Sequence, residues 1–265
     1  MKNIIFNSVE QFQFKIDHVI SSAPTTSHAH QDCEIYVNVS GNVSFMVENN
    51  LYPVFHGNAI ITKPFEFHNC IYHDNSPHEH YCINFTANEN SSFASQFFNR
   101  KSGTDNLVVL DDKKTKELID ACYNLAEKEL NEVDKYFYFF KLLSILADGD
   151  LKTSENQKTL PQDVLISVNY INKNLTEKIS LDTLAEISNV SVNSLERHFF
   201  ASLNMTPFTY IQKKRLAYSA KLLSAGKTVL EACYDSGFTD YPHYIALFKK
   251  YYGLTPLKYK KSILK

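Results

Sequence analysis

The stretch LDTLAEISNVSVNSLERHFF (residues 181–200) decides the fold, because it recurs as VLEACYDSGFTDYPHYIALFKK (residues 229–250). A step of 48 residues relates Ala185, Asn189 and Val190 to Cys233, Gly237 and Phe238, which are a small residue, a turn former and an apolar residue in each copy. The step then becomes 49, and it relates Phe199, Asn204, Thr206, Pro207 and Tyr210 to Phe248, Gly253, Thr255, Pro256 and Tyr259. The chain is therefore predicted to contain two copies of one helical unit.

Each copy has the pattern of a helix-turn-helix. A first helix is predicted near Leu181–Ser188 and again near Val229–Ser236. Asn189 and Gly237 follow these helices, and both tolerate the left-handed backbone conformation that a tight turn needs. The predicted N-caps of the second helices are Ser191 and Thr239.

The second helix of each copy is predicted to bury one stripe and expose the other. Leu195 and Phe199 lie four residues apart, as do Tyr244 and Phe248, so each pair shares one face of its helix. The opposite face is then free to enter a DNA major groove. A long helix over Phe208–Leu223 is expected to join the two units rigidly, which would place two readers about one helical turn of DNA apart.

This part of the chain resembles the AraC/XylS family of transcription regulators over Ile179–Lys261. The residues that carry the resemblance are Leu181–Ala185, Ser191, Leu195, Phe199, Thr206, Pro207, Arg215, Leu216, Ala220, Leu222, Leu223, Gly237, Phe238 and Phe248–Tyr259. The resemblance implies an operator-binding regulator that works with RNA polymerase, and it leaves open whether the regulator activates or represses.

The resemblance also implies which residues meet DNA. The positions expected to contact DNA are Asn193, Ser194, Glu196, Arg197, Tyr241, Pro242, Ile245, Lys249 and Lys250. Asn and Arg donate to purine edges, Glu accepts from cytosine, and the lysines suit phosphates. Ala246 stands where relatives usually carry Arg, so the second unit is expected to rely more on thymine methyls, DNA shape or phosphates. Tyr241 is left open between base contact and packing.

Charge divides the chain in a way that fits this reading. The net charge of the whole is −2, yet residues 162–265 carry 14 Lys and Arg against 8 Asp and Glu, a net of +6. The first 161 residues carry 13 against 21, a net of −8. Such asymmetry is expected when only one domain meets a polyanion.

The first hundred residues are predicted to form β structure. Short apolar runs alternate with turn formers, and the predicted strands are Phe12–Ile16, Glu34–Val39, Val43–Val47, Ala59–Thr62 and His80–Phe85. The spacing favours a sandwich or barrel. His73, His78 and His80 flank the turn at 74–77, and they are expected to belong to a polar loop.

A group of histidines in this region resembles the cupin superfamily. His28, His30, Glu34 and Gly41 have the spacing of its first motif, and Gly57, Pro64 and His68 are similar to its second, with Glu66 where cupins often have Gly. The resemblance implies a cavity that takes either a small organic effector, such as a sugar, or a divalent metal held by the histidines and Glu34. We expect an effector and no permanent metal or other cofactor. The predicted effector-binding residues are His28, His30, Glu34, Tyr36 and His68.

From Asp111 to Ala147 the apolar period changes to three and four, which predicts two amphipathic helices with a break near Asn131. Their surplus of apolar surface, notably Tyr136–Phe140, is expected to pack against a second subunit. The polar stretch after them suits an interdomain linker.

Together these patterns predict a two-domain α+β protein. A cupin-like effector-binding β-barrel is expected over residues 1–105, a helical dimerisation hairpin over 106–148, a linker over 149–162, and an all-α DNA-binding domain over 163–265 with two helix-turn-helix units joined by a long helix. Five scattered cysteines and the lack of a long apolar run favour a cytoplasmic protein that is neither disulfide-bonded nor membrane-embedded.

Three functions compete at this stage. The preferred one is an effector-responsive, homodimeric transcription regulator with no catalytic residues. The alternatives are a metal-dependent cupin enzyme with an accessory helical domain, and a DNA-binding protein whose barrel serves only to dimerise.

Overall fold

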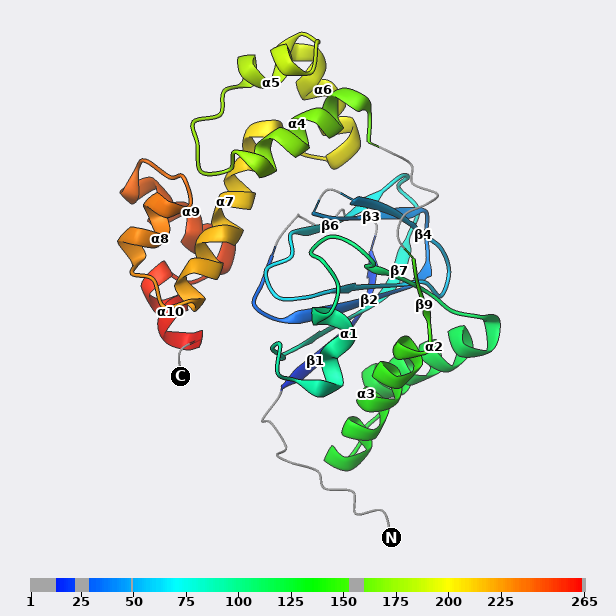
Figure 1. Ribbon diagram of the computed structural model, residues 1–265. Coiled ribbons are helices and arrows are strands. Elements are labelled where there is room, and N and C mark those ends of the chain that lie inside the picture. The colour runs from blue at the N-terminus through cyan, green and yellow to red at the C-terminus, as the bar shows by residue number, and fades with distance from the viewer. Residues whose placement is uncertain (1–12, 22–28, 49, 153–159, 264–265) are drawn as a thin grey trace.

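The computed structural model describes residues 13–21, 29–48, 50–152 and 160–263 (Figure 1). Its strands are β1 (Phe14–Ser21), β2 (Cys33–Ser40), β3 (Val43–Val47), β4 (Asn50–Val54), β5 (Ala59–Thr62), β6 (His68–Tyr72), β7 (His78–Phe85), β8 (Leu107–Val109) and β9 (Asp150–Lys152). Its helices are the 3₁₀ turn η1 (Ser92–Ala94), α1 (Ser95–Phe98), α2 (Asp112–Glu127), α3 (Glu132–Ala147), α4 (Gln162–Lys173), α5 (Leu181–Ile187), α6 (Val192–Leu203), α7 (Pro207–Ser224), α8 (Val229–Asp235), α9 (Tyr241–Tyr252) and α10 (Pro256–Ile263).

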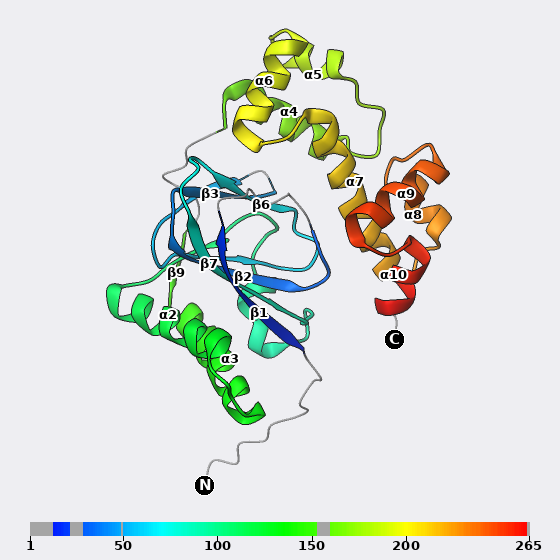
Figure 2. The ribbon, with the colours of Figure 1, turned by 180° about the vertical axis from the view of Figure 1, so that it is seen from behind.

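The predicted two-domain α+β organisation is confirmed. Within the described residues the strands form two antiparallel sheets, a six-stranded one in the order β1-β7-β2-β5-β8-β9 and a three-stranded one in the order β4-β3-β6. We call these strands with η1, α1, α2 and α3 the β domain. Within this domain, helices α2 and α3 lie on one side of the strands, and the C-terminal helices of the chain lie on the other side (Figures 1 and 2).

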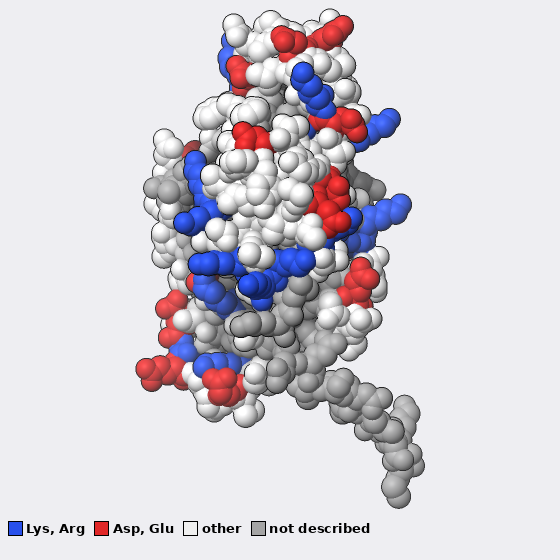
Figure 3. All heavy atoms as spheres, turned by 90° about the vertical axis from the view of Figure 1, so that its left-hand side faces the viewer, with Lys and Arg blue, Asp and Glu red and all other residues white. Residues whose placement is uncertain are grey.

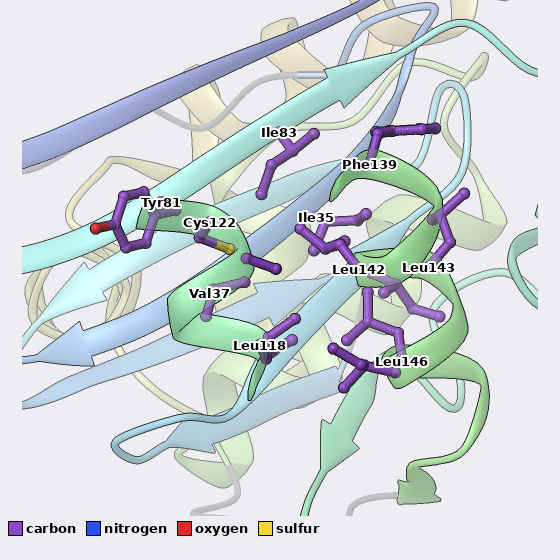
Figure 4. Close-up of a cluster of buried hydrophobic side chains, with 14 of the residues drawn as sticks. Ile35, Val37, Tyr81, Ile83, Leu118, Cys122, Phe139, Leu142, Leu143 and Leu146 are labelled. Carbon is purple, nitrogen blue, oxygen red and sulfur yellow. The ribbon is translucent and has the colours of Figure 1, made fainter. Parts of the chain in front are cut away.

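Strand alternation divides the two faces of the large sheet. Ile35 and Val37 of β2 point toward α2 and α3, where they meet Leu118, Phe139 and other apolar side chains (Figure 4). Glu34 and Tyr36 alternate with these two residues along β2, so they point to the opposite face, between the two sheets. Burial of an aromatic side chain such as Phe139 stabilises the folded protein by about 1.5–3 kcal/mol.

Four strands, β4, β6, β8 and β9, were not predicted. The last two lie in segments predicted as the helical hairpin and the linker, and both are only three residues long, so the sequence carries little strand signal there. Strand β4 contains Pro53, which interrupts the usual strand signal but is tolerated because β4 lies at an edge of its sheet. Strand β6 begins with His68 and Asn69, whose polar side chains hide the apolar pattern. Strands β1 and β7 also extend beyond the predicted Phe12–Ile16 and His80–Phe85, since they span Phe14–Ser21 and His78–Phe85.

The C-terminal helices form two lobes around α7. The first lobe contains α4, α5, α6 and the start of α7, and its core includes Leu195, Phe199 and Tyr210. The second lobe contains the end of α7 with α8, α9 and α10, and its core includes Tyr244 and Phe248. The predicted buried stripes of the second helix of each unit, α6 and α9, which we call the recognition helices, are thus confirmed. The expected long helix spans Pro207–Ser224.

The turns within the lobes are as predicted, with one exception. Asn189 and Gly237 adopt φ values of +54° and +89°, in the left-handed region. Ser191 caps α6, since its side chain accepts a hydrogen bond from the Ser194 amide. The prediction of Thr239 as the cap of α9 was wrong: Asp240 accepts from the His243 amide, and a carboxylate at that position also complements the helix dipole.

Candidate DNA-binding surface and effector pocket

Helix α6 presents most of the predicted readers of the first lobe. Asn193 and Arg197 are exposed, and Glu196 is half-buried. Ser194 is engaged in the cap, because its hydroxyl lies 2.9 Å from that of Ser191. The helix is anchored from its side by His198, whose Nδ1 lies 2.6 Å from a carboxylate oxygen of Asp163 on α4.

Helix α9 divides its predicted contacts between surface and core. Pro242, Lys249 and Lys250 are exposed, whereas Tyr241 and Ile245 are half-buried and pack against the core of the second lobe. For Tyr241 this favours packing over base contact. His243, which nothing in the sequence singled out, is also exposed in the first turn of α9 and lies 3.4 Å from the Gln212 amide nitrogen.

Basic side chains gather on the exposed side of the C-terminal helices. Figure 3 shows a band of Lys and Arg across this face, with acidic side chains both above and below it. Such a band provides the electrostatic attraction for phosphates that DNA binding requires.

A cavity of about 490 Å³ lies between the two sheets of the β domain. This volume is within the usual range for small-molecule sites. Aromatic and polar side chains share its wall, and the polar groups include His30, Glu34, Tyr36, His68, His80 and Asn84. Four of the five predicted effector-binding residues therefore line one cavity, while His28 lies outside the described residues.

Glu34 stands at the centre of the polar wall. One of its oxygens lies 3.0 Å from Nε2 of His30 and 3.1 Å from the Asn84 amide, and the other lies 3.5 Å from Nε2 of His68. Burial alone would raise the pKa of Glu34, but the two histidines hold it well below its usual range. Burial opposes charge on His68 too, yet Glu34 keeps the pKa of His68 above 6.5.

Two histidines on β7 were assigned wrongly to a polar loop. His78 and His80 are buried in the strand, and their rings stack 4.6 Å apart. His78 shares a short hydrogen bond with the Tyr36 hydroxyl, and burial lowers the pKa of His80 to about 4, so that this ring is neutral. The alternation from His78 to Asn84 was the signal that could have placed both on the cavity face.

His30 lies outside the strands, in an irregular segment that precedes β2. Its Nδ1 lies 3.0 Å from the Asp32 carbonyl, which orients the ring. His30, Glu34 and His68 offer ligand atoms that all lie within 4.8 Å of one another, a set that suits a divalent metal. The same atoms suit hydrogen bonds to a polar ligand.

The comparisons with known proteins agree with this arrangement. A model of the AraC-like ligand binding domain matches residues 20–135, and a model of a helix-turn-helix domain matches residues 184–262. The HTH-type transcriptional regulator YdeC of Bacillus subtilis is 22% identical over 88% of this chain and 85% of its own length. The HTH-type transcriptional activator RhaS of Mannheimia succiniciproducens is 28% identical over 56% of each protein.

Other matches are partial or distant. The bifunctional transcriptional activator/DNA repair enzyme AdaA of B. subtilis is 34% identical over 35% of this chain and 44% of its own length. Among solved structures, ToxT of Vibrio cholerae covers 95% of this chain and 98% of its own at 14% identity, with a TM-score of 0.38. None of the helices in the described residues is long and apolar enough to cross a membrane.

A ligand-binding β domain joined to a double helix-turn-helix defines a class of DNA-binding transcriptional regulators. This chain belongs to the AraC family of that class.

Proposed function

We propose that this chain is a homodimeric, effector-responsive regulator that acts with RNA polymerase in the cytoplasm, where its operator DNA is found. The observation that carries the proposal is the pairing of two recognition helices, each with an outward face, and a polar cavity in the same chain. Asn193, Arg197, Lys249 and Lys250 are the proposed principal DNA contacts. The other predicted contact residues lie on the same two helices, and they are Ser194, Glu196, Pro242, Tyr241 and Ile245.

The chemistry of the cavity supports a small, polar, uncharged effector such as a sugar. Ionised Glu34 accepts hydrogen bonds, while His30, His68 and Asn84 offer donors. Tyr36, Phe45 and Phe85 supply flat apolar faces. We propose no catalytic role for these residues.

The helix pair after the sheets supports dimerisation. On α3, Val133, Tyr136, Phe137 and Phe140 are between 41% and 75% exposed, and they form an apolar ridge on the outside of the β domain. A ridge of this kind suits the same ridge on a second copy.

Selection from random DNA tests the regulator proposal. Purified full-length protein should enrich one sequence with two contacted major grooves, and thermal-shift screening of neutral monosaccharides should then find a ligand that His30→Ala no longer binds. If no sequence is enriched, the proposal is wrong.

The metal-binding set favours one second candidate, a metal-dependent cupin enzyme. Elemental analysis of protein purified without chelators separates the two. Stoichiometric iron, manganese, nickel or zinc that is lost in Glu34→Gln would favour this candidate over a metal-free effector site.

A further inference from the structure

The turn between β5 and β6, residues 63–67, contacts both DNA-binding lobes. Phe67 is buried in the core of the first lobe, where its ring meets Tyr210 edge to face at 5.4 Å. Phe65, two residues earlier, packs against the core of the second lobe. One short segment of the β domain thus touches both halves of the DNA-binding domain.

This turn is held rigidly from behind. The Glu66 carboxylate accepts two hydrogen bonds from Arg100, at 2.8 and 2.5 Å, and one from the Gly103 amide at 2.7 Å. A further bond from the Lys63 amide at 2.9 Å closes the turn. Phe65 has a φ of +63°, which a bulky residue such as Phe rarely adopts unless its surroundings enforce it.

Helix α7 is fixed against the same turn by charge. The Lys214 ammonium, which is almost buried, forms a hydrogen-bonded ion pair with Glu48 and lies 5.3 Å from the centre of the Phe67 ring. Glu48 in turn accepts from the Phe67 amide at 2.9 Å. Because α7 contributes to the cores of both lobes, a contact at its middle influences both.

Two hydrogen bonds connect the turn with the effector cavity. The Phe65 amide donates to the His30 carbonyl at 2.8 Å, and Nδ1 of His68 donates to the Glu66 carbonyl at 2.8 Å. Both histidines line the cavity. A ligand that displaces either histidine would therefore also displace the turn at residues 65–67.

We propose that Phe65 and Phe67 are positioning residues for DNA recognition: their turn sets the relative placement of the two lobes, and His68 transmits occupancy of the cavity to it. The second clause rests on the proposed effector function. The physical reason is that α6 and α9 must enter successive major grooves about 34 Å apart, so a small rotation of one lobe removes one reader from its groove.

Distances between spin labels on the two lobes test the proposal in the full-length protein. Glu186→Cys on α5 and Leu230→Cys on α8 provide exposed attachment sites. Burial raises the pKa of the native thiols of Cys33, Cys70, Cys82, Cys122 and Cys233, so they react slowly with the label. Protein without the two added cysteines measures the remaining background.

The labelled protein should give one narrow distance distribution. Phe65→Ala should broaden or shift it, and Phe65→Leu should restore it because Leu keeps an apolar side chain there. Phe55→Ala, at a 68% exposed phenylalanine in the β4–β5 turn, is the matched control and should change nothing. An unchanged distribution in Phe65→Ala would overturn the positioning role, even if the protein still selects one DNA sequence as the proposed function requires.

A second pair of variants tests the link to the cavity without a known ligand. His68→Asn keeps a donor near the position of Nδ1, whereas His68→Leu removes it. The expected result is a shifted distribution in His68→Leu and a native one in His68→Asn, with circular dichroism confirming that both fold. Identical native distributions would overturn transmission through His68 and leave the regulator function untouched.

Discussion

Arg197, a proposed base contact, lies beside His198 on the exposed side of α6. Its Nη2 lies 3.5 Å from Nε2 of His198, and the other ring nitrogen of His198 lies 2.6 Å from Asp163. Arg197→Ala should weaken binding to the selected sequence by about 1–3 kcal/mol and leave binding to random DNA nearly unchanged, because a contact with a base edge distinguishes sequences whereas a phosphate contact does not. Fluorescence anisotropy with both DNAs measures the two losses, and equal losses would remove Arg197 from the readers.

Asp240 is the residue-scale correction that stability measurements can check. Its side chain accepts from the His243 amide at 2.9 Å at the start of α9. Asp240→Ala should lower the free energy of unfolding by about 1 kcal/mol, the usual value of an N-cap, whereas Thr239→Ala should have little effect. Urea denaturation of the two variants compares them. A larger loss in Thr239→Ala would reinstate the sequence-based assignment.

Among the elements, β1 is attached to both a strand and a helix through His18. The two ring nitrogens lie 2.9 Å from Glu79 on β7 and 2.8 Å from Glu127 at the end of α2. Partial burial opposes the charge, but the two carboxylates raise the pKa of His18 above 6.5.

This raised pKa predicts a pH dependence. The stabilisation from charged His18 is fully present below about pH 6.5 and is lost as the pH rises through the higher folded-state pKa. His18→Gln should therefore flatten the decline in melting temperature above neutral pH, and His56→Gln, at an exposed turn, is the control. Identical profiles for wild type and His18→Gln would contradict this assignment.

Helix α3 offers a test of the proposed dimer. Phe137 is 58% exposed on the apolar ridge, so a charge there has no fold-based reason to disturb the monomer. Phe137→Lys should raise the dimer dissociation constant about 30-fold or more, equivalent to at least ~2 kcal/mol. Sedimentation velocity at micromolar concentration shows the change, with Phe55→Lys as control. A wild-type chain that sediments as a monomer would remove the dimer from the proposal.

Element by element, the helices were easier to predict than the strands and the site. The repeat marked both recognition helices, because their buried residues recur at fixed steps along the sequence. Strand β6 was missed because its first residue, His68, is polar. The His68 side chain lines the cavity, so it breaks the apolar pattern by which a strand is recognised. The contact between Phe67 and Tyr210 could not be predicted, because the neighbouring sequence does not show which domain will cover an apolar side chain.

For the whole molecule, the shared core predicts cooperative unfolding. Met46, Leu51, Phe67 and Ile71 of the β domain belong to the same cluster as the core of the first lobe. Calorimetry of the wild type should show one transition. Phe67→Ala, which removes about 3–5 kcal/mol of packing, should separate it into two as the lobes uncouple from the β domain. One transition that merely moves to lower temperature would show that the domains stay coupled without Phe67.

Strand β9 has a consequence for how firmly the domains must hold each other. By pairing with β8, it keeps the chain against the β domain as far as Lys152, and only nine residues then precede Gln162 at the start of α4. The ten Cα–Cα steps from Lys152 to Gln162 reach about 35 Å at full extension. A lobe that detaches therefore stays at an effective concentration on the order of millimolar near its docking face. An interface of only micromolar intrinsic affinity is then almost fully occupied, so even weak contacts between the lobes and the β domain keep the lobes in one placement.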